Sequence, residues 1–364
     1  MTLPFRTPPA RLCLLRLSAL GDVCHAVPIV RTIQQAWPET AITWIIGKVE
    51  HRLLEGLEGV EFVVFDKARG ARAYLDLRRR LRGRRFDVLL HMQLSMRASL
   101  ASTCVRADVR LGFDRARARN LQWLFTNHTV APRTREHVLD SFFGFTEALG
   151  IRERVLRWDI PVPAQAREYA GSVLTGDKPV LVISPCSSMS YRNWHPAGYA
   201  AVADHAAAHG MQVVLTGGNS PVEQRYAREI AALAKSRPLD LVGRTDLKQL
   251  LAILARATAI VAPDSGPAHM GTAVGVPVIG LYACTNPERA RPYLSAAYAV
   301  NKYPEAVRWK YGRPVAALEW GTRVRDSHAM NLITVADVTA VLDRILASGE
   351  RRCGTRAHFG PPTA

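Results

Sequence analysis

Three short segments of the chain carry residues whose types and spacing could support chemistry. The first is Leu17–Asp22, where Gly21 and Asp22 follow an apolar run and open a helical pattern. Glycine permits a tight turn close to a ligand, and the carboxylate of Asp22 could act as a general base. Alternatively, Asp22 caps a helix that we expect to begin at about Asp22 or Val23. Both interpretations stay open on these residues alone.

The second segment, residues 184–196, follows an apolar run in the second half of the chain. It carries Ser187, Ser188 and Arg192 immediately before a helical pattern. Hydroxyl groups and a guanidinium at the start of a helix suit an oxyanion such as a pyrophosphate. The alternative interpretation is an ordinary serine-rich loop with a capped helix.

The third segment, residues 262–273, is the most informative. Asp264, Ser265 and Gly266 follow an apolar strand pattern and open a helix of small residues, with His269 one turn further along. Backbone N–H groups at a helix start, a serine and a glycine that allows close approach together favour a phosphate site. A single helical histidine is more often structural, but these neighbours favour a functional role for His269.

Several common motifs are absent from the sequence. No GxGxxG follows the first apolar run, and no GxxxxGK[ST] occurs, which argues against a nicotinamide-dependent dehydrogenase and a P-loop NTPase. There is no DxD pair and no HExxH, so we expect no metal ligands.

Alternating strand and helix patterns must position these segments. Apolar runs of strand length occur at 11–17, 41–46, 61–65, 86–91, 180–184, 212–216, 259–262 and 276–281, with helical patterns such as 23–36, 71–81 and 335–347 between or after them. Continuous apolar strands separated by helices predict parallel sheets covered on both faces. We therefore expect two Rossmann-like, doubly wound α/β domains that face each other across a cleft.

The chain length also favours two domains. At 364 residues it exceeds the ~250–300 residues that one core usually holds. The proline-punctuated segment 160–163 predicts a boundary between residues 1–160 and 161–348. We expect residues 283–330 to be irregular and the tail, residues 349–364, to be disordered.

The composition indicates a globular protein with an anionic partner. The net charge of +17 and pI of about 10.1 favour nucleic acid, a phosphate-bearing substrate or an anionic membrane. No apolar run is long enough to span a bilayer, and Arg11 and Arg16 interrupt the only candidate signal segment, so we expect a cytoplasmic protein. The six scattered cysteines predict reduced thiols.

At this point the sequence resembles the lipopolysaccharide heptosyltransferases of glycosyltransferase family 9, over about residues 10–347. The resemblance rests on SALGDVCHAVPIV, SSMSYRNWHP and DSGPAHMGTAVGVPVIGLYACTNP, in this order. It implies a GT-B type, inverting, metal-independent enzyme that transfers heptose from ADP-heptose to the lipopolysaccharide inner core. The ADP-sugar is then a substrate, and no cofactor is implied.

The resemblance also assigns roles to residues. Asp22 matches the catalytic base, and Ser187, Ser188 and Arg192 match donor-phosphate positions. Glu223 falls near an acidic position associated with the ribose, and Asp264, Ser265, Gly266 and His269 match the donor-binding turn. Arginine at 192 departs from the family's common lysine and presents a planar fork instead of a point charge.

The resemblance also implies a role for the basic stretch Lys67–Arg85, which is binding of the anionic acceptor. Arg69, Arg72, Arg78 and Arg117 could bind the anionic lipopolysaccharide precursor, and the protein could lie peripherally on the inner face of the membrane. The alternative is a solvated, arginine-rich helix end. Two other functions stay open: a glycosyltransferase with another nucleotide-sugar donor, and a basic nucleic-acid-binding protein. The second lacks an aromatic platform and a recognition motif, so we expect no nucleic-acid partner.

Overall fold

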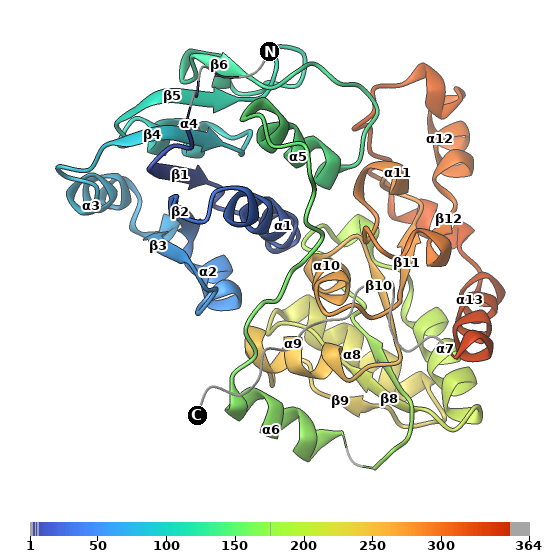
Figure 1. Cartoon of the computed structure of the whole chain (residues 1–364). Coiled ribbons are helices and arrows are strands. Elements are labelled where there is room, and N and C mark those ends of the chain that lie inside the picture. The colour runs from blue at the N-terminus through green and yellow to red at the C-terminus, as the bar shows by residue number, and fades with distance from the viewer. Residues whose placement is uncertain (1–2, 4, 6, 175, 350–364) are drawn as a thin grey trace. The chain divides into compact units, whose positions relative to one another are not determined.

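The structure is a computed structural model that describes residues 3, 5, 7–174 and 176–349 (Figure 1). It divides into two compact units, Met1–Pro161 and Val162–Ala364. Each unit has its own parallel sheet with helices packed on it. The predicted fold class, two Rossmann-like α/β domains, is confirmed. The expectation of a disordered tail falls on residues that, apart from Gly349, lie outside the described part.

Unit 1 is built on one parallel sheet in the order β3-β2-β1-β4-β5-β6. Its strands are β1 (Arg11–Leu15), β2 (Ala41–Gly47), β3 (Val60–Phe65), β4 (Phe86–His91), β5 (Ala107–Gly112) and β6 (His128–Thr129). The central strand β1 is apolar on both faces because helices cover both, and its Leu14 pairs with Trp44 of β2 and Leu90 of β4.

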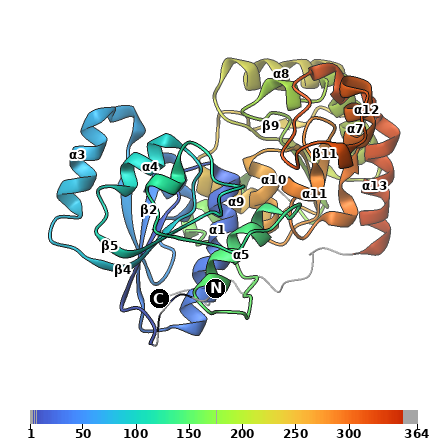
Figure 2. The same cartoon turned by 90° about the horizontal axis from the view of Figure 1, so that it is seen from above.

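The helices of unit 1 are α1 (Leu20–Ala36), α2 (Lys48–Leu54), α3 (Ala71–Arg80), α4 (Met96–Ser102) and α5 (Val138–Ala148). Helices α3 and α4 lie on the sheet of unit 1 (Figure 2). They bury Leu77 and Ala98 in one core with Cys13 and Leu15 of β1. Helices α1 and α5 pack against each other. The helix that carries Asp22 is therefore anchored on the sheet by its apolar side chains, of which Val23, Val27 and Val30 are fully buried.

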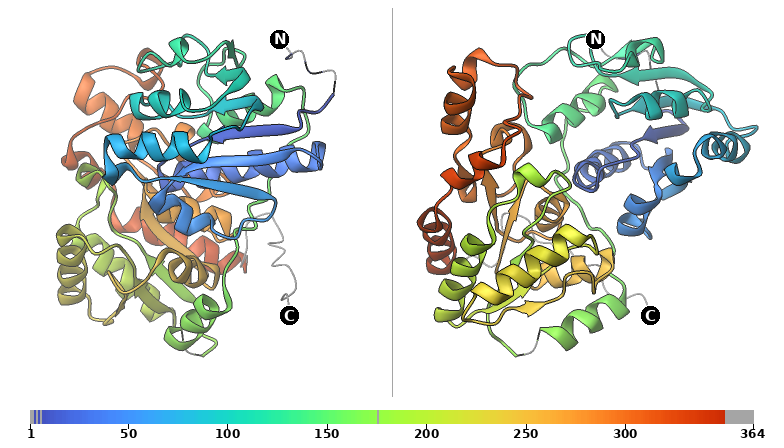
Figure 3. Two further views of the ribbon diagram at one scale, coloured as in Figure 1. Left: turned by 90° about the vertical axis from the view of Figure 1, so that its left-hand side faces the viewer. Right: turned by 180° about the vertical axis from the view of Figure 1, so that it is seen from behind.

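Unit 2 repeats the same strand order with its own sheet, β12-β11-β10-β7-β8-β9. The strands are β7 (Val180–Ile183), β8 (Gln212–Leu215), β9 (Leu239–Asp240), β10 (Ala259–Pro263), β11 (Val278–Tyr282) and β12 (Val300–Asn301). The helices are α6 (Ala164–Val173), α7 (Pro196–Ala208), α8 (Pro221–Leu233), α9 (Leu247–Ala255), α10 (Gly266–Ala273), α11 (Pro287–Ala290), α12 (Tyr303–Tyr311) and α13 (Val335–Ser348). Helix α13 lies alongside α7 (Figure 3).

Each sheet therefore has a switch point, where the chain order of the strands reverses. It lies between β1 and β4 in unit 1 and between β7 and β10 in unit 2. Ligands of open parallel sheets bind at the carboxyl ends of the strands beside such a point. The three segments singled out in the sequence follow β1, β7 and β10, so each lies at a switch point of its own unit.

Helix α10 approaches its sheet closely. An added Cβ at Gly271 would lie 2.6 Å from Cγ2 of Val278 and 2.7 Å from Cδ1 of Ile260, so only glycine lets the helix lie directly on β10 and β11. The first turn of α10, which follows Ser265, is consequently held in a fixed position at the end of β10.

The sequence located the inner strands but not the edges. All eight predicted strands form, to within two residues at each end, and β5 and the two-residue strands β6, β9 and β12 were not predicted. The expectation that residues 283–330 are irregular is wrong, because this stretch contains α11, β12 and α12. The reason is that these elements are short and mix polar with apolar residues, so periodicity does not reveal them.

Two further expectations concern the whole chain. Among the described residues, no helix is long and apolar enough to cross a membrane. The five cysteines of the described part, Cys13, Cys24, Cys104, Cys186 and Cys284, are free thiols. Cys353 lies outside the described residues.

Candidate functional site

Asp22 lies in the first turn of α1, at the carboxyl end of β1. Helix α1 begins at Leu20 with Ala19 as its N-cap, so the interpretation of Asp22 as the N-cap is wrong. The chain enters the helix three residues earlier, and the carboxylate of Asp22 instead accepts the backbone N–H of Ala19 at 3.2 Å. Its side chain is 32% exposed, which leaves it open to a substrate.

Arg16 holds the Asp22 carboxylate in place. Its Nη2 lies 2.5 Å from Oδ2 of Asp22, and its Nη1 donates to the backbone carbonyl of Met92 at 2.5 Å. The guanidinium also lies over the ring of Phe142, 5.1 Å from the ring centroid. A buried charge needs such partners, and this one joins the loop after β1 to the residue after β4.

Gln93 joins the same two loops. Its Oε1 accepts the backbone N–H of Leu17 at 2.6 Å, and its Nε2 donates to Oγ of Ser18 at 3.1 Å. The turn that carries Asp22 is therefore fixed from both strands of the switch point. Arg16 and Gln93 were not predicted as site residues, although a charge inside the apolar run 11–17 was a signal for Arg16.

The switch point of unit 2 is organised by Arg192 and Asp264. Nη1 of Arg192 lies 3.0 Å from Oδ2 of Asp264 and 3.2 Å from the Asp264 carbonyl oxygen. The two side chains are only 11% and 13% exposed. Oγ of Ser187 donates to the same carbonyl at 3.0 Å. The loops after β7 and β10 are thus tied together, as the predicted phosphate site requires.

Asp264 is held in its ionised form. Burial raises the pKa of this carboxyl group, but the neighbouring His269, the charge of Arg192 and Thr285 together lower it below the usual 3.8. Nε2 of His269, which is itself buried, lies 3.8 Å from Oδ1 of Asp264. His269 therefore faces the carboxylate of Asp264 in the structure.

Two buried donors at this site lack a hydrogen-bond partner within the described chain. They are Nε of Arg192 and Oγ of Ser265. Ser265 is the N-cap of α10, yet its hydroxyl makes no capping hydrogen bond. Unsatisfied buried donors are costly, and here they lie beside the free N–H groups of a helix start. This arrangement is suited to an anion.

The other predicted donor residues lie in the same edge of unit 2 but differ in their contacts. Ser188 is exposed in the loop after β7. Glu223 lies in the first turn of α8, where its Oε1 accepts from the N–H of Gly218 at 2.7 Å and its Oε2 from Oγ of Ser220 at 2.6 Å. A ribose hydroxyl would have to share this carboxylate with the loop after β8.

The four predicted acceptor arginines fall into two groups. Arg69, Arg72 and Arg78 are exposed on or just before α3, and Arg69 pairs with Asp76. Arg117 instead points into unit 1, where it pairs with Asp114 and Glu136 and donates to Oγ of Ser141 at 3.0 Å. Its contacts are those of a residue that braces the 114–141 region.

Two doubly wound parallel sheets, with ligand-type residues at the switch point of each, define a GT-B type glycosyltransferase. The chain belongs to glycosyltransferase family 9 (heptosyltransferase), whose sequence profile matches residues 74–313. The predicted enzyme class and the resemblance are therefore confirmed.

Similar proteins support this assignment. The chain is 37% identical over 341 residues to the lipopolysaccharide core heptosyltransferase OpsX of Haemophilus influenzae, covering 94% of this chain and 98% of the relative. Its fold matches a glycosyl transferase family 9 structure from Veillonella parvula, with TM-score 0.78, 21% identity and coverage of 93% and 98%. It also matches E. coli ADP-heptose lps heptosyltransferase II, with TM-score 0.70, 20% identity and coverage of 93% and 99%.

We expect the replacement Arg192→Met to destabilise unit 2 by about 3–5 kcal/mol, because it leaves the buried Asp264 carboxylate without its cation. Arg192→Lys keeps a positive charge beside Asp264, so this variant should lose much less stability than Arg192→Met. Urea denaturation of both variants and the parent protein measures the difference. Equal stability of the Met variant and the parent would show that the ion pair does not organise this edge.

Proposed function

We propose that the protein is an inverting, metal-independent heptosyltransferase that transfers heptose from ADP-heptose to the lipopolysaccharide inner core. The observation that carries this proposal is the switch point of unit 2. There Arg192 and Ser265 each retain a buried, unused donor atom, Nε and Oγ, beside the start of α10. The names of the family-9 relatives supply the sugar and the acceptor class.

Unit 2 is the proposed donor-binding unit. The diphosphate would accept hydrogen bonds from Arg192, Ser188 and Ser265, and from the N–H groups of Gly266 and Ala268 at the start of α10. Ser187 would join them by turning its hydroxyl from the Asp264 carbonyl to the diphosphate. Asp264 and His269 would keep Arg192 in position, since Asp264 already contacts the guanidinium. Glu223 is the proposed ribose contact, sharing its carboxylate with the loop after β8.

Asp22 is the proposed general base of unit 1. In an inverting transfer the acceptor hydroxyl attacks the anomeric carbon from the side opposite the departing ADP, and a base must take the hydroxyl proton. The carboxylate of Asp22 is partly exposed, and Arg16 and the N–H of Ala19 fix its orientation. These contacts leave carboxylate lone pairs for the acceptor.

The departing diphosphate gains negative charge as the sugar–phosphate bond breaks. The proposal assigns the stabilisation of this charge to Arg192, the serine hydroxyls and the amides of α10, which are donors already fixed before reaction. These groups supply the electrostatic role that a divalent cation would otherwise have, which is why we propose transfer without a metal.

Unit 1 is also the proposed acceptor-binding unit. The side chains of Arg69, just before α3, and of Arg72 and Arg78 on α3 are exposed, and their charges suit the phosphates and carboxylates of a lipopolysaccharide precursor. Because that precursor is a membrane lipid, we place the reaction at the cytoplasmic face of the inner membrane, with the protein bound peripherally. Arg117 has internal partners and would act on the acceptor only through the loop it braces.

Purified protein should release ADP from ADP-heptose only when a Kdo-containing lipopolysaccharide acceptor is present. We expect turnover without added divalent metal and in the presence of EDTA, measured by ADP release and by the mass of the product. A panel of other nucleotide-sugars serves as the control. Preferential turnover of another donor would contradict the assigned sugar, and loss of turnover in EDTA at unchanged stability would contradict the metal-free mechanism.

We expect Asp22→Asn to lower kcat by ~10²–10⁴-fold, because the amide cannot take a proton but can still accept the N–H of Ala19. ADP binding, measured by calorimetry, should stay unchanged. Asp108→Asn is the matched control, since it removes a carboxylate of unit 1 that lies on β5 and pairs with Arg85. Near-normal kcat in the Asp22 variant would exclude this residue as the base.

Replacing Arg69, Arg72 and Arg78 together with serine should weaken acceptor binding by about a hundredfold, because each charge near an anionic surface contributes about 1 kcal/mol and tenfold corresponds to about 1.4 kcal/mol. The measurement is the KM for a Kdo–lipid A acceptor in vesicles at several salt concentrations. Serine replacements of Lys178, Arg237 and Arg244, which are exposed in unit 2, remove the same charge elsewhere. If both triple variants raise the KM equally, the effect comes from net charge alone, and a specific role of Arg69, Arg72 and Arg78 is contradicted.

A further inference from the structure

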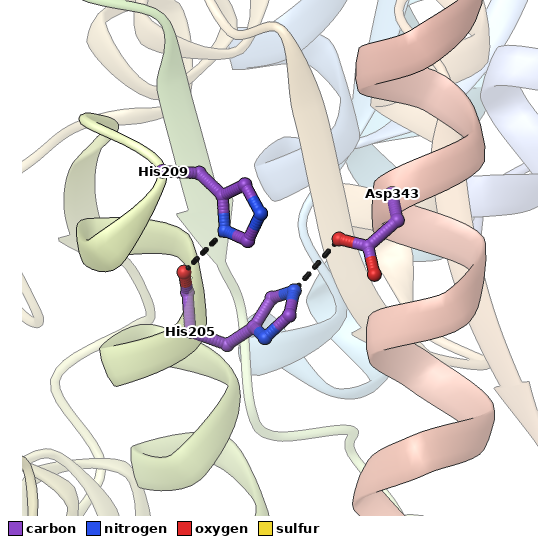
Figure 4. Close-up of side chains that lie close together, drawn as sticks. All are labelled: His205, His209 and Asp343. Carbon is purple, nitrogen blue, oxygen red and sulfur yellow. Dashed lines mark hydrogen bonds and ion pairs between the residues drawn. The ribbon is translucent and has the colours of Figure 1, made fainter.

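A cluster of two histidines and one aspartate joins α7 to α13 (Figure 4). His205 is in the last turn of α7, His209 follows that helix directly, and Asp343 is on α13. One ligand atom from each residue lies within 4.8 Å of the other two. The two imidazoles are neighbours because residues four apart share one face of a helix, and their ring centroids are 4.6 Å apart.

Apolar packing fixes the spacing of this cluster. Val202 and Ala206 of α7 and Val338, Leu342 and Ile345 of α13 are buried in one hydrophobic core. Leu342 is the residue next to Asp343, so its burial directs α13 toward α7 at the level of the histidines. The two helices therefore hold the side chains together without help from an ion.

A backbone hydrogen bond orients the ring of His209. Its Nδ1 lies 2.9 Å from the carbonyl oxygen of His205. A carbonyl oxygen only accepts, so Nδ1 donates here and Nε2 is the nitrogen left for a metal ion. Nδ1 bonded to a backbone carbonyl is the arrangement that orients metal-binding imidazoles through Nε2.

Nε2 of His205 lies 2.7 Å from Oδ1 of Asp343. The carboxylate accepts here, so a proton lies between the two groups. A single metal ion could take a ring nitrogen of each histidine and an oxygen of this carboxylate as ligands.

We propose that His205, His209 and Asp343 bind a divalent transition-metal ion, zinc in the first instance. Zinc takes histidine nitrogen and carboxylate oxygen at about 2.0–2.2 Å in a tetrahedral arrangement, with water as a fourth ligand. The side chains of His205 and Asp343 are 30% and 46% exposed, so ion and water have access. Binding would draw together three ligand atoms that already lie within 4.8 Å of one another.

The proposed site is separate from the donor edge of unit 2. Helix α7 starts after the loop that carries Arg192, and its 13 residues extend about 20 Å away from that edge. A metal ion there would clamp α13 onto α7 and would take no part in the transfer reaction. Its binding is therefore independent of the proposed function.

The test uses full-length protein without an affinity tag. EDTA first removes any bound metal ion, and desalting then removes the EDTA. We expect Zn²⁺ to bind saturably at 1:1 in competition with a chromophoric chelator, and Co²⁺ to give the visible absorption of a tetrahedral site. Hydrogen exchange of α13 should slow on zinc binding. Absence of saturable binding, or binding without added protection of α13, would overturn the proposal.

Three variants and one matched control assign the ligands. His205→Ala, His209→Ala and Asp343→Asn should each weaken zinc binding by at least about tenfold, since even outer partners of a metal site contribute that much. His328→Asn is the control, because His328 also pairs with a carboxylate, Asp326, at 2.9 Å. Circular dichroism confirms that each variant is folded. Unchanged affinity in the three variants, or an equal loss in the control, would contradict the assigned ligands.

Discussion

The buried ion pair between Arg192 and Asp264 is the interaction on which the donor edge of unit 2 depends. It connects the loops after β7 and β10, the two strands at the switch point. Buried ion pairs add little to stability compared with well-packed apolar residues, because desolvation offsets their attraction. A pair retained here, with an unused donor on the arginine, therefore fits a role in holding an anion better than a role in holding the fold.

In unit 1, different residues connect the ends of the two strands at the switch point. Arg16, in the loop after β1, pairs with Asp22 in the first turn of α1 and also donates to the carbonyl of Met92 after β4. In both units a single arginine therefore bridges two strand ends that are distant in sequence. The difference lies in the carboxylate: Asp264 is buried and faces a histidine, whereas Asp22 is partly open to solvent. This difference matches a positioning role for Asp264 and a proton-accepting role for Asp22.

The inner strands and the polar residues at their ends could be predicted from the sequence, whereas the contacts between those ends could not. Apolar runs such as Phe86–His91 located the inner strands, and the polar residues after β1, β7 and β10 marked the strand ends. The contact between Arg192 and Asp264 spans 72 positions and depends on β7 and β10 being neighbours, which no local pattern encodes. The start of α1 was misplaced because a carboxylate at the third helical position resembles an N-cap in sequence.

Arg192 is the proposed ligand of the donor's diphosphate. Calorimetry of ADP and AMP binding to the parent protein and to Arg192→Gln tests this role, because glutamine can still donate to Asp264 but carries no charge. We expect the parent to bind ADP more tightly than AMP, and the variant to lose most of this difference. An undiminished preference for ADP in the folded variant would contradict it.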